Sequence, residues 1–280
     1  MPELPEVETI ARGLRATCLN KVIKKLEVFN LSSVENPSQL NLQGAKIEQI
    51  HRKGKYLLFN LTHEGPDSPD QAGCLLLHLR MTGTLRYLVS GETLDLPYLR
   101  FLLYFTDGTQ LAFQDIRKFG RLYLYPDEAA INQAGYLHLG PDCLDFAFTL
   151  PYLTKIIQAK GTRTIKDLLL DQRLMAGIGN IYSDEILFQA GIRPDRLGRD
   201  MLTSEIETLY QTIIDKLQEG ILAKGCSFRN YLGIDGQKGN FQQSLKVYQR
   251  EGLPCFTCQS EIVKSKVGGR SSRYCPNCQK

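Results

Sequence analysis

The chain has 280 residues, of which 42% are hydrophobic and 23% charged, and its formal net charge is +4. This is the composition of an ordinary globular protein with room for two domains, and the charge is too small to diagnose a nucleic-acid binder by itself. No apolar run approaches the roughly 20 residues that a membrane-spanning helix needs, and the acidic start from Met1 to Ile10 is unlike a signal peptide. We therefore expect a cytoplasmic protein with no membrane partner.

The predicted elements change character along the chain. A first helix begins near Pro5, because proline suits a first helical turn and acidic side chains favour its positive dipole end. Short apolar runs between turn-rich stretches, from about Lys21 to Tyr125, predict a β-sandwich or barrel. Helical spacing of apolar residues follows over 164–174, 182–190 and 203–222. We expect an α+β protein with a β-sandwich domain over 1–135 that includes the N-terminal helix, a linker over 136–150, a helical domain over 151–235 and a cysteine module over 244–280.

The cysteine module has the spacing of a metal site. Two C-x2-C pairs are separated by sixteen residues, which suits four thiolates around one tetrahedral zinc ion; the four are Cys255, Cys258, Cys275 and Cys278. The intervening residues fit a β-hairpin that turns at Gly268 and Gly269. With every ligand position filled by protein, the zinc would be structural; four free thiols or two disulfides are the alternatives. The isolated cysteines are predicted to be small buried or neutral residues: Cys18, Cys74, Cys143 and Cys226.

Basic side chains gather in the same module. Residues 244–280 hold seven Lys or Arg against two Glu, and the hairpin itself carries Lys264, Lys266, Arg270 and Arg273. Such a module on a nearly neutral body indicates a polyanionic partner, and cations on a hairpin suit phosphate contacts. A merely solvated basic tail is the alternative.

The N-terminus offers a reactive group. Methionine before proline is normally removed, and Pro2 would then carry a secondary amine that can form an iminium with a sugar carbon when it is uncharged. An ordinary α-amine titrates near 8, and a nearby helix N-terminus favours its neutral form. Glu3 is placed to transfer a proton, and Glu6 to hold or relay one. Without other support, the same residues read as an ordinary acidic helix cap.

The run from Met1 to Thr9 resembles the start of the formamidopyrimidine-DNA glycosylase family, the 8-oxoguanine DNA glycosylase/AP lyases. The resemblance extends over essentially the whole chain, through 54–58, 78–83, 115–120, 138–141, 169–172, 177–182, 190–194 and the terminal cysteines. It implies an N-terminal β-sandwich, a helical domain with a helix–two-turn–helix motif and a zinc-bound β-hairpin. It also implies double-stranded DNA with oxidised bases as the partner, one structural zinc ion and no cofactor in the chemistry.

The resemblance also implies roles for single residues. Pro2 matches the nucleophile that attacks C1′, Glu3 the proton donor to the deoxyribose and Glu6 a supporting acid. Lys55 matches a lysine that contacts phosphate and takes part in catalysis. Phosphate-binding positions are matched by His78, Arg117, Asn180 and Arg270, the last of which we also place among the catalytic residues.

Further matches concern the extruded base. Met81, Arg117 and Phe119 match three side chains that fill the void it leaves, because chemistry at C1′ requires the base to leave the stack. Residues 158–166 only partly match a lysine-rich loop, and we assign Lys166 as its DNA contact. Residues 225–236 match a loop that covers the base, with Ser227 and Arg229 as candidate lesion contacts.

Two alternatives remain at this stage. An endonuclease VIII-like enzyme for oxidised pyrimidines shares the proline nucleophile, but Leu4 and the three void-filling side chains favour the purine enzyme. A non-catalytic DNA-binding protein with a zinc hairpin would not need the set Pro2, Glu3, Glu6 and Lys55. We therefore predict a monomeric, nucleoid-associated bacterial enzyme that excises oxidised purines and cleaves the strand by β- and δ-elimination.

Overall fold

The computed structural model describes residues 1–63, 70–92, 95–131, 136–228 and 231–280. The chain forms two compact units. The first contains Met1–His138 and, from much later in the sequence, Ala223–Asn240; the second contains Leu139–Leu222 and Phe241–Lys280. Among the described residues, no helix is long and apolar enough to cross a membrane.

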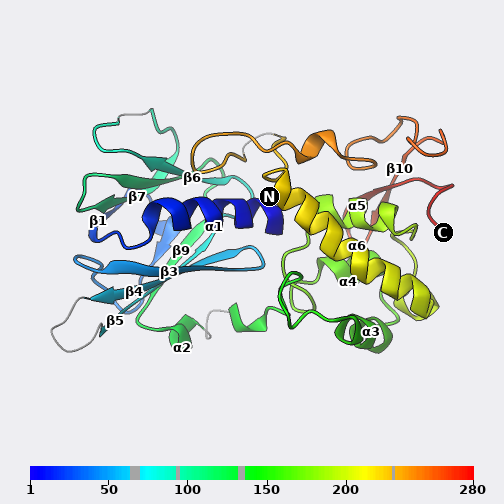
Figure 1. Cartoon of the computed structure of the whole chain (residues 1–280), viewed down its shortest axis with the longest axis horizontal. Coiled ribbons are helices and arrows are strands. Elements are labelled where there is room, and N and C mark those ends of the chain that lie inside the picture. The colour runs from blue at the N-terminus through cyan, green and yellow to red at the C-terminus, as the bar shows by residue number, and fades with distance from the viewer. Residues whose placement is uncertain (64–69, 93–94, 132–135, 229–230) are drawn as a thin grey trace. The chain divides into compact units, whose positions relative to one another are not determined.

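The first unit opens with helix α1 (Leu4–Cys18), drawn in dark blue in Figure 1. Its buried apolar residues recur at helical spacing, at Val7, Ile10, Leu14 and Cys18, so that one face lies in the hydrophobic core. The helix begins where the sequence predicts, with Glu3 at the N-cap position and a proline in the first turn.

Two sheets form the rest of this unit. One has the strand order β1 (Ile23–Val28), β7 (Leu99–Phe105), β8 (Gln110–Asp115), β6 (Gly83–Leu88), and all its pairs are antiparallel. The other has the order β2 (Val34–Glu35), β9 (Arg121–Tyr125), β5 (Asp70–His78), β4 (Tyr56–His63), β3 (Lys46–Lys53), and only the β2–β9 pair is parallel. One core cluster contains Phe59 and Leu77 from the second sheet together with Leu103 and Phe113 from the first. The predicted β-sandwich is confirmed.

Short elements complete the first unit and link it to the second. They are η1 (Leu31–Ser33), α2 (Glu128–Ile131) and η3 (Tyr136–His138). The late segment Ala223–Asn240 belongs to this unit because it packs and pairs here: Tyr87 N–H donates to the Ile234 carbonyl at 3.1 Å, and Ile234 is buried in the sandwich core. The sequence predicts residues 223–235 as part of the helical domain, whereas the structure groups them with the sandwich.

The second unit is helical and ends in a hairpin. Its helices are α3 (Leu150–Ala159), α4 (Ile165–Leu170), α5 (Asn180–Gln189) and α6 (Thr203–Leu222), with short turns η4 (Gly198–Asp200) and η5 (Phe241–Gln243). The helix predicted over 164–174 ends earlier, at Leu170, because the Asp171 carboxylate accepts the Arg173 N–H at 3.1 Å and turns the chain. Strands β10 (Val263–Val267) and β11 (Arg270–Tyr274) form the predicted hairpin, with its turn at Gly268–Gly269.

Candidate active site and nucleic-acid interface

The N-terminal proline lies beside two buried carboxylates. Glu3 and Glu6 are only 3% and 2% exposed, and they form a capping box in which the Glu3 N–H donates to Glu6 Oε2 at 2.7 Å. Pro2 is buried next to them, whereas Met1 is 44% exposed. While Met1 is attached, the Pro2 nitrogen is part of an amide; its removal would create an amine at the positive end of α1.

Glu6 is also held by the late segment of the same unit. The Cys226 N–H donates to Glu6 Oε1 at 2.7 Å, and the Tyr231 hydroxyl donates to the Glu6 carbonyl at 3.3 Å. Gly225 has a φ of +79°, and a Cβ there would lie 2.9 Å from Glu6 Oε1. Only glycine suits this position, because a side chain would meet both unfavourable backbone geometry and the carboxylate. The loop after α6 therefore fixes the acid that the sequence assigns as a supporting group.

Ser227 follows in that loop and uses its hydroxyl internally. Its Oγ donates to the Tyr231 carbonyl at 2.9 Å and accepts the Gly239 N–H at 2.9 Å. A lesion contact by Ser227 stays a prediction, and Arg229 lies outside the described residues.

Lys55 and His78 lie at the same end of two neighbouring strands of the second sheet, β4 and β5. Lys55 lies in the tight turn between β3 and β4 and is 6% exposed, while His78 ends β5 opposite Tyr56. Burial, together with the charges of Arg80 and Lys55, lowers the pKa of His78 to about 3, so its ring is neutral at pH 7. The Arg80 N–H donates to His78 Nδ1 at 2.9 Å, which leaves Nε2 as the protonated nitrogen. His78 can therefore donate a hydrogen bond but carries no charge for a phosphate.

The three predicted void-filling side chains lie together on the sandwich. Arg117 Nη1 is 3.4 Å from Met81 Sδ, and the Arg117 guanidinium is centred 4.7 Å from the Phe119 ring. Met81 and Phe119 are 46% and 47% exposed, and exposed apolar side chains that lie together are typical of a binding surface. The exposed cluster of Met81, Arg117 and Phe119 can offer an apolar wedge and a donor fork to a partner.

One buried carboxylate shapes the loops that carry this cluster. Asp115 is 1% exposed; its Oδ1 accepts from the Thr82 hydroxyl and from the Arg117 N–H at 3.1 Å, and its Oδ2 accepts the Gly120 N–H at 2.7 Å. Gly83 also borders the cluster, and a Cβ there would lie 2.8 Å from the Phe113 ring. Asp115 thus holds the two loops that carry the three exposed side chains, through the Thr82 hydroxyl in one loop and the Arg117 and Gly120 N–H groups in the other.

In the second unit, Asn180 is the first residue of α5. The preceding turn is held by the Gln172 side chain, which donates to the Ile178 carbonyl at 2.8 Å and accepts the Gly177 N–H at 3.0 Å. Asn180 Oδ1 is buried and has no hydrogen-bond partner among the described residues. Because this oxygen can only accept a hydrogen bond, a phosphate contact by Asn180 would have to use its Nδ2 group, and it stays a prediction.

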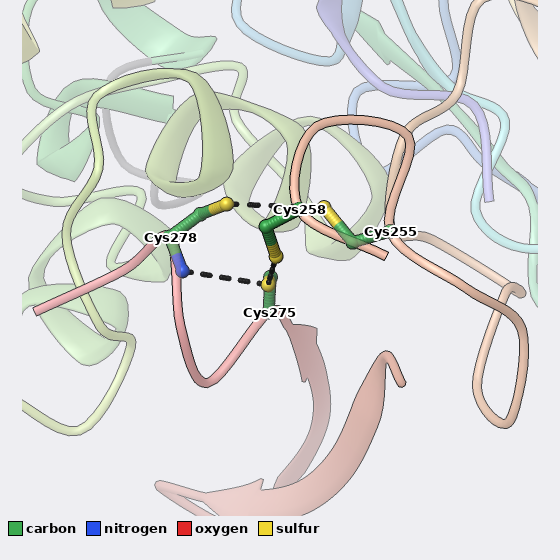
Figure 2. Close-up of side chains that lie close together, drawn as sticks. All are labelled: Cys255, Cys258, Cys275 and Cys278. Carbon is green, nitrogen blue, oxygen red and sulfur yellow. Dashed lines mark hydrogen bonds between the residues drawn. The ribbon is translucent and has the colours of Figure 1, made fainter. Parts of the chain in front are cut away.

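The four paired cysteines converge at the end of the second unit, as Figure 2 shows. Their sulfur atoms all lie within 4.8 Å of one another, with 3.9 Å between Cys255 and Cys278 and 3.3 Å between Cys258 and Cys275. A tetrahedral zinc with bonds of about 2.3 Å separates its sulfur ligands by roughly 3.8 Å. The cluster therefore fits a metal ion. The other four cysteines are buried free thiols, as predicted.

The hairpin cations differ in their availability. Arg270 is exposed, and its side chain has no hydrogen bond or ion pair with any described residue. Arg273 instead forms an ion pair with Glu251 at 3.2 Å and lies over the Tyr248 ring, and Lys264 is 3.5 Å from the same carboxylate. Arg273 is therefore used within the unit, and the pKa of Glu251 is lowered to about 2, chiefly by its hydrogen bond from Arg273.

Lys166 was expected to contact DNA, and the structure corrects this. The residue is 0% exposed and its ammonium is paired with the buried carboxylate of Asp184. A side chain so enclosed cannot reach a phosphate. The sequence analysis missed the cause, because the partner is eighteen residues away on another helix and no local pattern links the two.

Comparisons with known proteins agree with this arrangement. The family model for the formamidopyrimidine-DNA glycosylase N-terminal domain matches residues 1–122, and that for the formamidopyrimidine-DNA glycosylase H2TH domain matches 139–231. A formamidopyrimidine-DNA glycosylase of Pelotomaculum thermopropionicum is 42% identical and covers 100% of this chain and 99% of its own. The chain belongs to the formamidopyrimidine-DNA glycosylase family.

Solved structures of this glycosylase family share the fold. A Lactococcus lactis FPG mutant in complex with a Fapy-dG-containing DNA has a TM-score of 0.88 at 34% identity, and each chain is covered completely. A Lactococcus lactis Fpg in complex with an abasic-site-containing DNA has a TM-score of 0.86 at 34% identity, with 99% of each chain covered. The MutM (FPG) protein from Thermus thermophilus has a TM-score of 0.86 at 37% identity, with 99% and 98% covered.

Several residues that shape the glycosylase site could not be singled out from the sequence. Asp115 and Gln172 lie inside runs that carried the family resemblance, yet only the hydrogen bonds show that they hold Arg117 and the turn before Asn180. Asp184 and Glu185 are adjacent acids on α5 that are each 1% exposed. Acidic residues at such positions have no sequence signature, because a charge is expected at the surface.

Proposed function

We propose that this chain is a bifunctional glycosylase/AP lyase of base excision repair that removes oxidised purines from duplex DNA, with Pro2 as the nucleophile. The observation that carries the proposal is the placement of Pro2 at the N-terminus of α1, between an exposed Met1 and the buried carboxylates of Glu3 and Glu6. Membership of the formamidopyrimidine-DNA glycosylase family supports a role for all three residues in the same reaction, the excision of a damaged base.

The chemistry begins at the sugar. The Pro2 amine attacks C1′ of the damaged nucleotide, the bond to the base breaks, and Glu3 supplies a proton to the deoxyribose as the ring opens to an iminium. The base leaves with the bonding electrons and is protonated. Abstraction of sugar protons then drives β-elimination and δ-elimination, and hydrolysis releases Pro2. A one-nucleotide gap flanked by phosphates remains.

Binding must first extrude the base. The exposed cluster of Met81, Arg117 and Phe119 supports this step, because extrusion leaves a void that an apolar wedge and a guanidinium can fill. Neutral His78 donates a hydrogen bond to the phosphate backbone, with Lys55, Asn180 and Arg270 as the other contacts of the two units. We expect the substrate to be chromosomal DNA, and the enzyme to act as a monomer at the bacterial nucleoid in the cytoplasm.

The metal at the four-cysteine cluster is zinc in this proposal. Four thiolates at tetrahedral separations are the donor set that structural zinc prefers, and no open coordination position remains for catalysis. Zinc would organise the ends of the hairpin that presents Arg270, and the reaction itself would proceed on the side chains of the first unit.

Borohydride trapping tests the proposal. The protein with a native N-terminus is incubated with a duplex that contains 8-oxoguanine, reduced, and mapped by mass spectrometry; we expect an adduct on Pro2. A matched protein with an uncleaved N-terminal extension keeps every side chain, but its Pro2 nitrogen is part of an amide, and we expect no adduct on Pro2 from it. An adduct on a lysine, or equal trapping by both proteins, would overturn the mechanism. Preferential trapping on a thymine glycol duplex would favour the pyrimidine-specific alternative.

A further inference from the structure

A buried ion pair in the second unit has no role in the chemistry proposed above. Lys166 on α4 and Asp184 on α5 are paired, and both side chains are 0% exposed. Burial raises the pKa of the Asp184 carboxyl, and the Lys166 ammonium opposes that rise. Taking two charges out of water is costly, and an apolar pair would often be as stable. The pair therefore calls for an explanation other than stability.

Both members of the pair hold the same strand of the zinc hairpin. Lys166 Nζ donates to the Ser271 carbonyl at 3.2 Å, and Asp184 Oδ2 accepts the Arg273 N–H at 3.1 Å. These backbone groups belong to β11, whose first residue is Arg270. The main chain next to the exposed Arg270 guanidinium is thus fixed by two buried charged groups, which form stronger hydrogen bonds than neutral ones.

The cysteine module, residues 244–280, packs against α4 and α5 at two further places. A Cβ on Gly268, in the hairpin turn, would overlap the Asp167 carboxylate on α4, so the turn lies directly against that helix. Glu185, next to Asp184 on α5, accepts the backbone N–H groups of Lys246, Val247 and Tyr248 at 2.8 to 2.9 Å. The cysteine module therefore packs against α4 and α5. Lys166, Asp184 and Glu185 form hydrogen bonds with its backbone, and Asp167 lies against its hairpin turn.

We propose that Lys166 and Asp184 are positioning residues that hold the Arg270 guanidinium in the place where it binds a DNA phosphate. The same helix α5 carries Asn180 at its first turn, one turn before Asp184, so one rigid element positions both predicted phosphate contacts of this unit. The inference rests on the proposed role of Arg270 in DNA binding.

A double-mutant cycle tests whether the pair acts through Arg270. The double variant Lys166→Met/Asp184→Asn removes the pair without leaving an unpaired charge, and Arg270→Ala removes the contact itself. Affinity is measured by fluorescence anisotropy on a duplex with a non-cleavable abasic analogue. We expect Arg270→Ala to weaken binding about tenfold, since a hydrogen bond to a charged group is typically worth that much. The combined variant should then bind within about twofold of Arg270→Ala alone. If the two effects multiply, Lys166 or Asp184 acts independently of Arg270 and the inference is wrong.

A second pair of variants loosens the docking without touching the buried charges. Gly268 and Gly269 both have positive φ, at +55° and +78°, so alanine strains either; only Gly268→Ala also collides with Asp167, since a Cβ on Gly269 meets nothing within 4 Å. We expect Gly268→Ala to weaken DNA binding several-fold more than Gly269→Ala, and to have no added effect when Arg270 is alanine. These variants decide the question if the double variant of the pair does not fold; equal effects of the two would refute the inference.

Two controls separate positioning from general stability and from the proposed chemistry. Lys21→Met removes a partly buried lysine of the first unit that is paired with Asp107, away from the cysteine module, and we expect its DNA affinity to stay within twofold of the wild type. Zinc content is measured for every variant. Borohydride trapping of the wild type reports on the Pro2 chemistry separately: trapping with multiplicative effects in the cycle rejects only the positioning role, whereas absent trapping rejects the proposed function.

Discussion

Asp115→Asn should impair base extrusion more than strand cleavage. The carboxylate now accepts from the Gly120 N–H at 2.7 Å and from the Arg117 N–H at 3.1 Å, on different oxygens. An asparagine has one oxygen, so in either orientation of its amide one of these N–H groups faces an NH2 group. The loss of a hydrogen bond to a charged acceptor costs about 1.5–3 kcal/mol. If about 1.4 kcal/mol of this falls on ordering the loop that carries Arg117 and Phe119, base excision slows roughly tenfold.

Single-turnover assays on two duplexes measure this. We expect roughly tenfold slower excision from an 8-oxoguanine duplex, and cleavage of a pre-formed abasic duplex within about threefold of the wild type, because the abasic site has no damaged base to extrude. Urea unfolding gives the accompanying loss of stability. Asp107→Asn is the matched control, since Asp107 accepts the Thr109 N–H at 3.0 Å in an exposed turn between β7 and β8. An equal loss on both duplexes would show that Asp115 does not act through the void-filling cluster.

Three further predictions concern other parts of the molecule. Gly225→Ala should destabilise the protein and reduce trapping, because its Cβ would approach Glu6; Gly91→Ala, at a similar φ of +80° but in open space, controls for backbone strain, and equal unfolding midpoints would contradict the argument. The contribution of His78 to stability should fall as the pH drops from about 6.5 towards 3, because His78 has a pKa of about 3 when folded and an ordinary one when unfolded. Between pH 7.5 and 5.5 the wild type should therefore lose about 1.4 kcal/mol more of its free energy of unfolding than His78→Asn, as compared by urea unfolding at the two pH values. Cys275→Ser should lose the metal and weaken DNA binding, measured by zinc content and anisotropy; a zinc-free variant with unchanged affinity would disconnect the cluster from DNA binding.

The local features of the fold could be predicted from the sequence. The hairpin turn at Gly268–Gly269, the helix over 203–222 and the start of α1 all follow from neighbouring residues, and the structure has them at or close to the predicted positions. Their determinants lie within a few residues along the chain: cysteine spacing, glycine at positive φ, apolar periodicity and a proline in the first turn.

Features that depend on distant partners could not be predicted. In the sequence, Lys166 resembles a surface cation, but in the structure it is paired with the buried Asp184. Arg273 belongs to the same basic hairpin as Arg270, but its guanidinium is paired with Glu251. The early end of α4 depends on one competing hydrogen bond at Asp171. For the candidate site, the sequence predicts the side chains that contact DNA. It does not predict Asp115 or Gln172, whose hydrogen bonds hold the backbone near Arg117 and Asn180.

The return of residues 223–240 to the sandwich has a consequence for synthesis on the ribosome. The Glu6 carboxylate cannot receive its hydrogen bond from Cys226 until the helical residues up to 222 have already been made. The first unit therefore lacks residues 223–240, which pack near Pro2 and Glu6, while most of the second unit is translated. A fragment ending at residue 138 would lack this segment, and the hydrogen bonds from Cys226 and Tyr231 that hold Glu6 would form only late in synthesis.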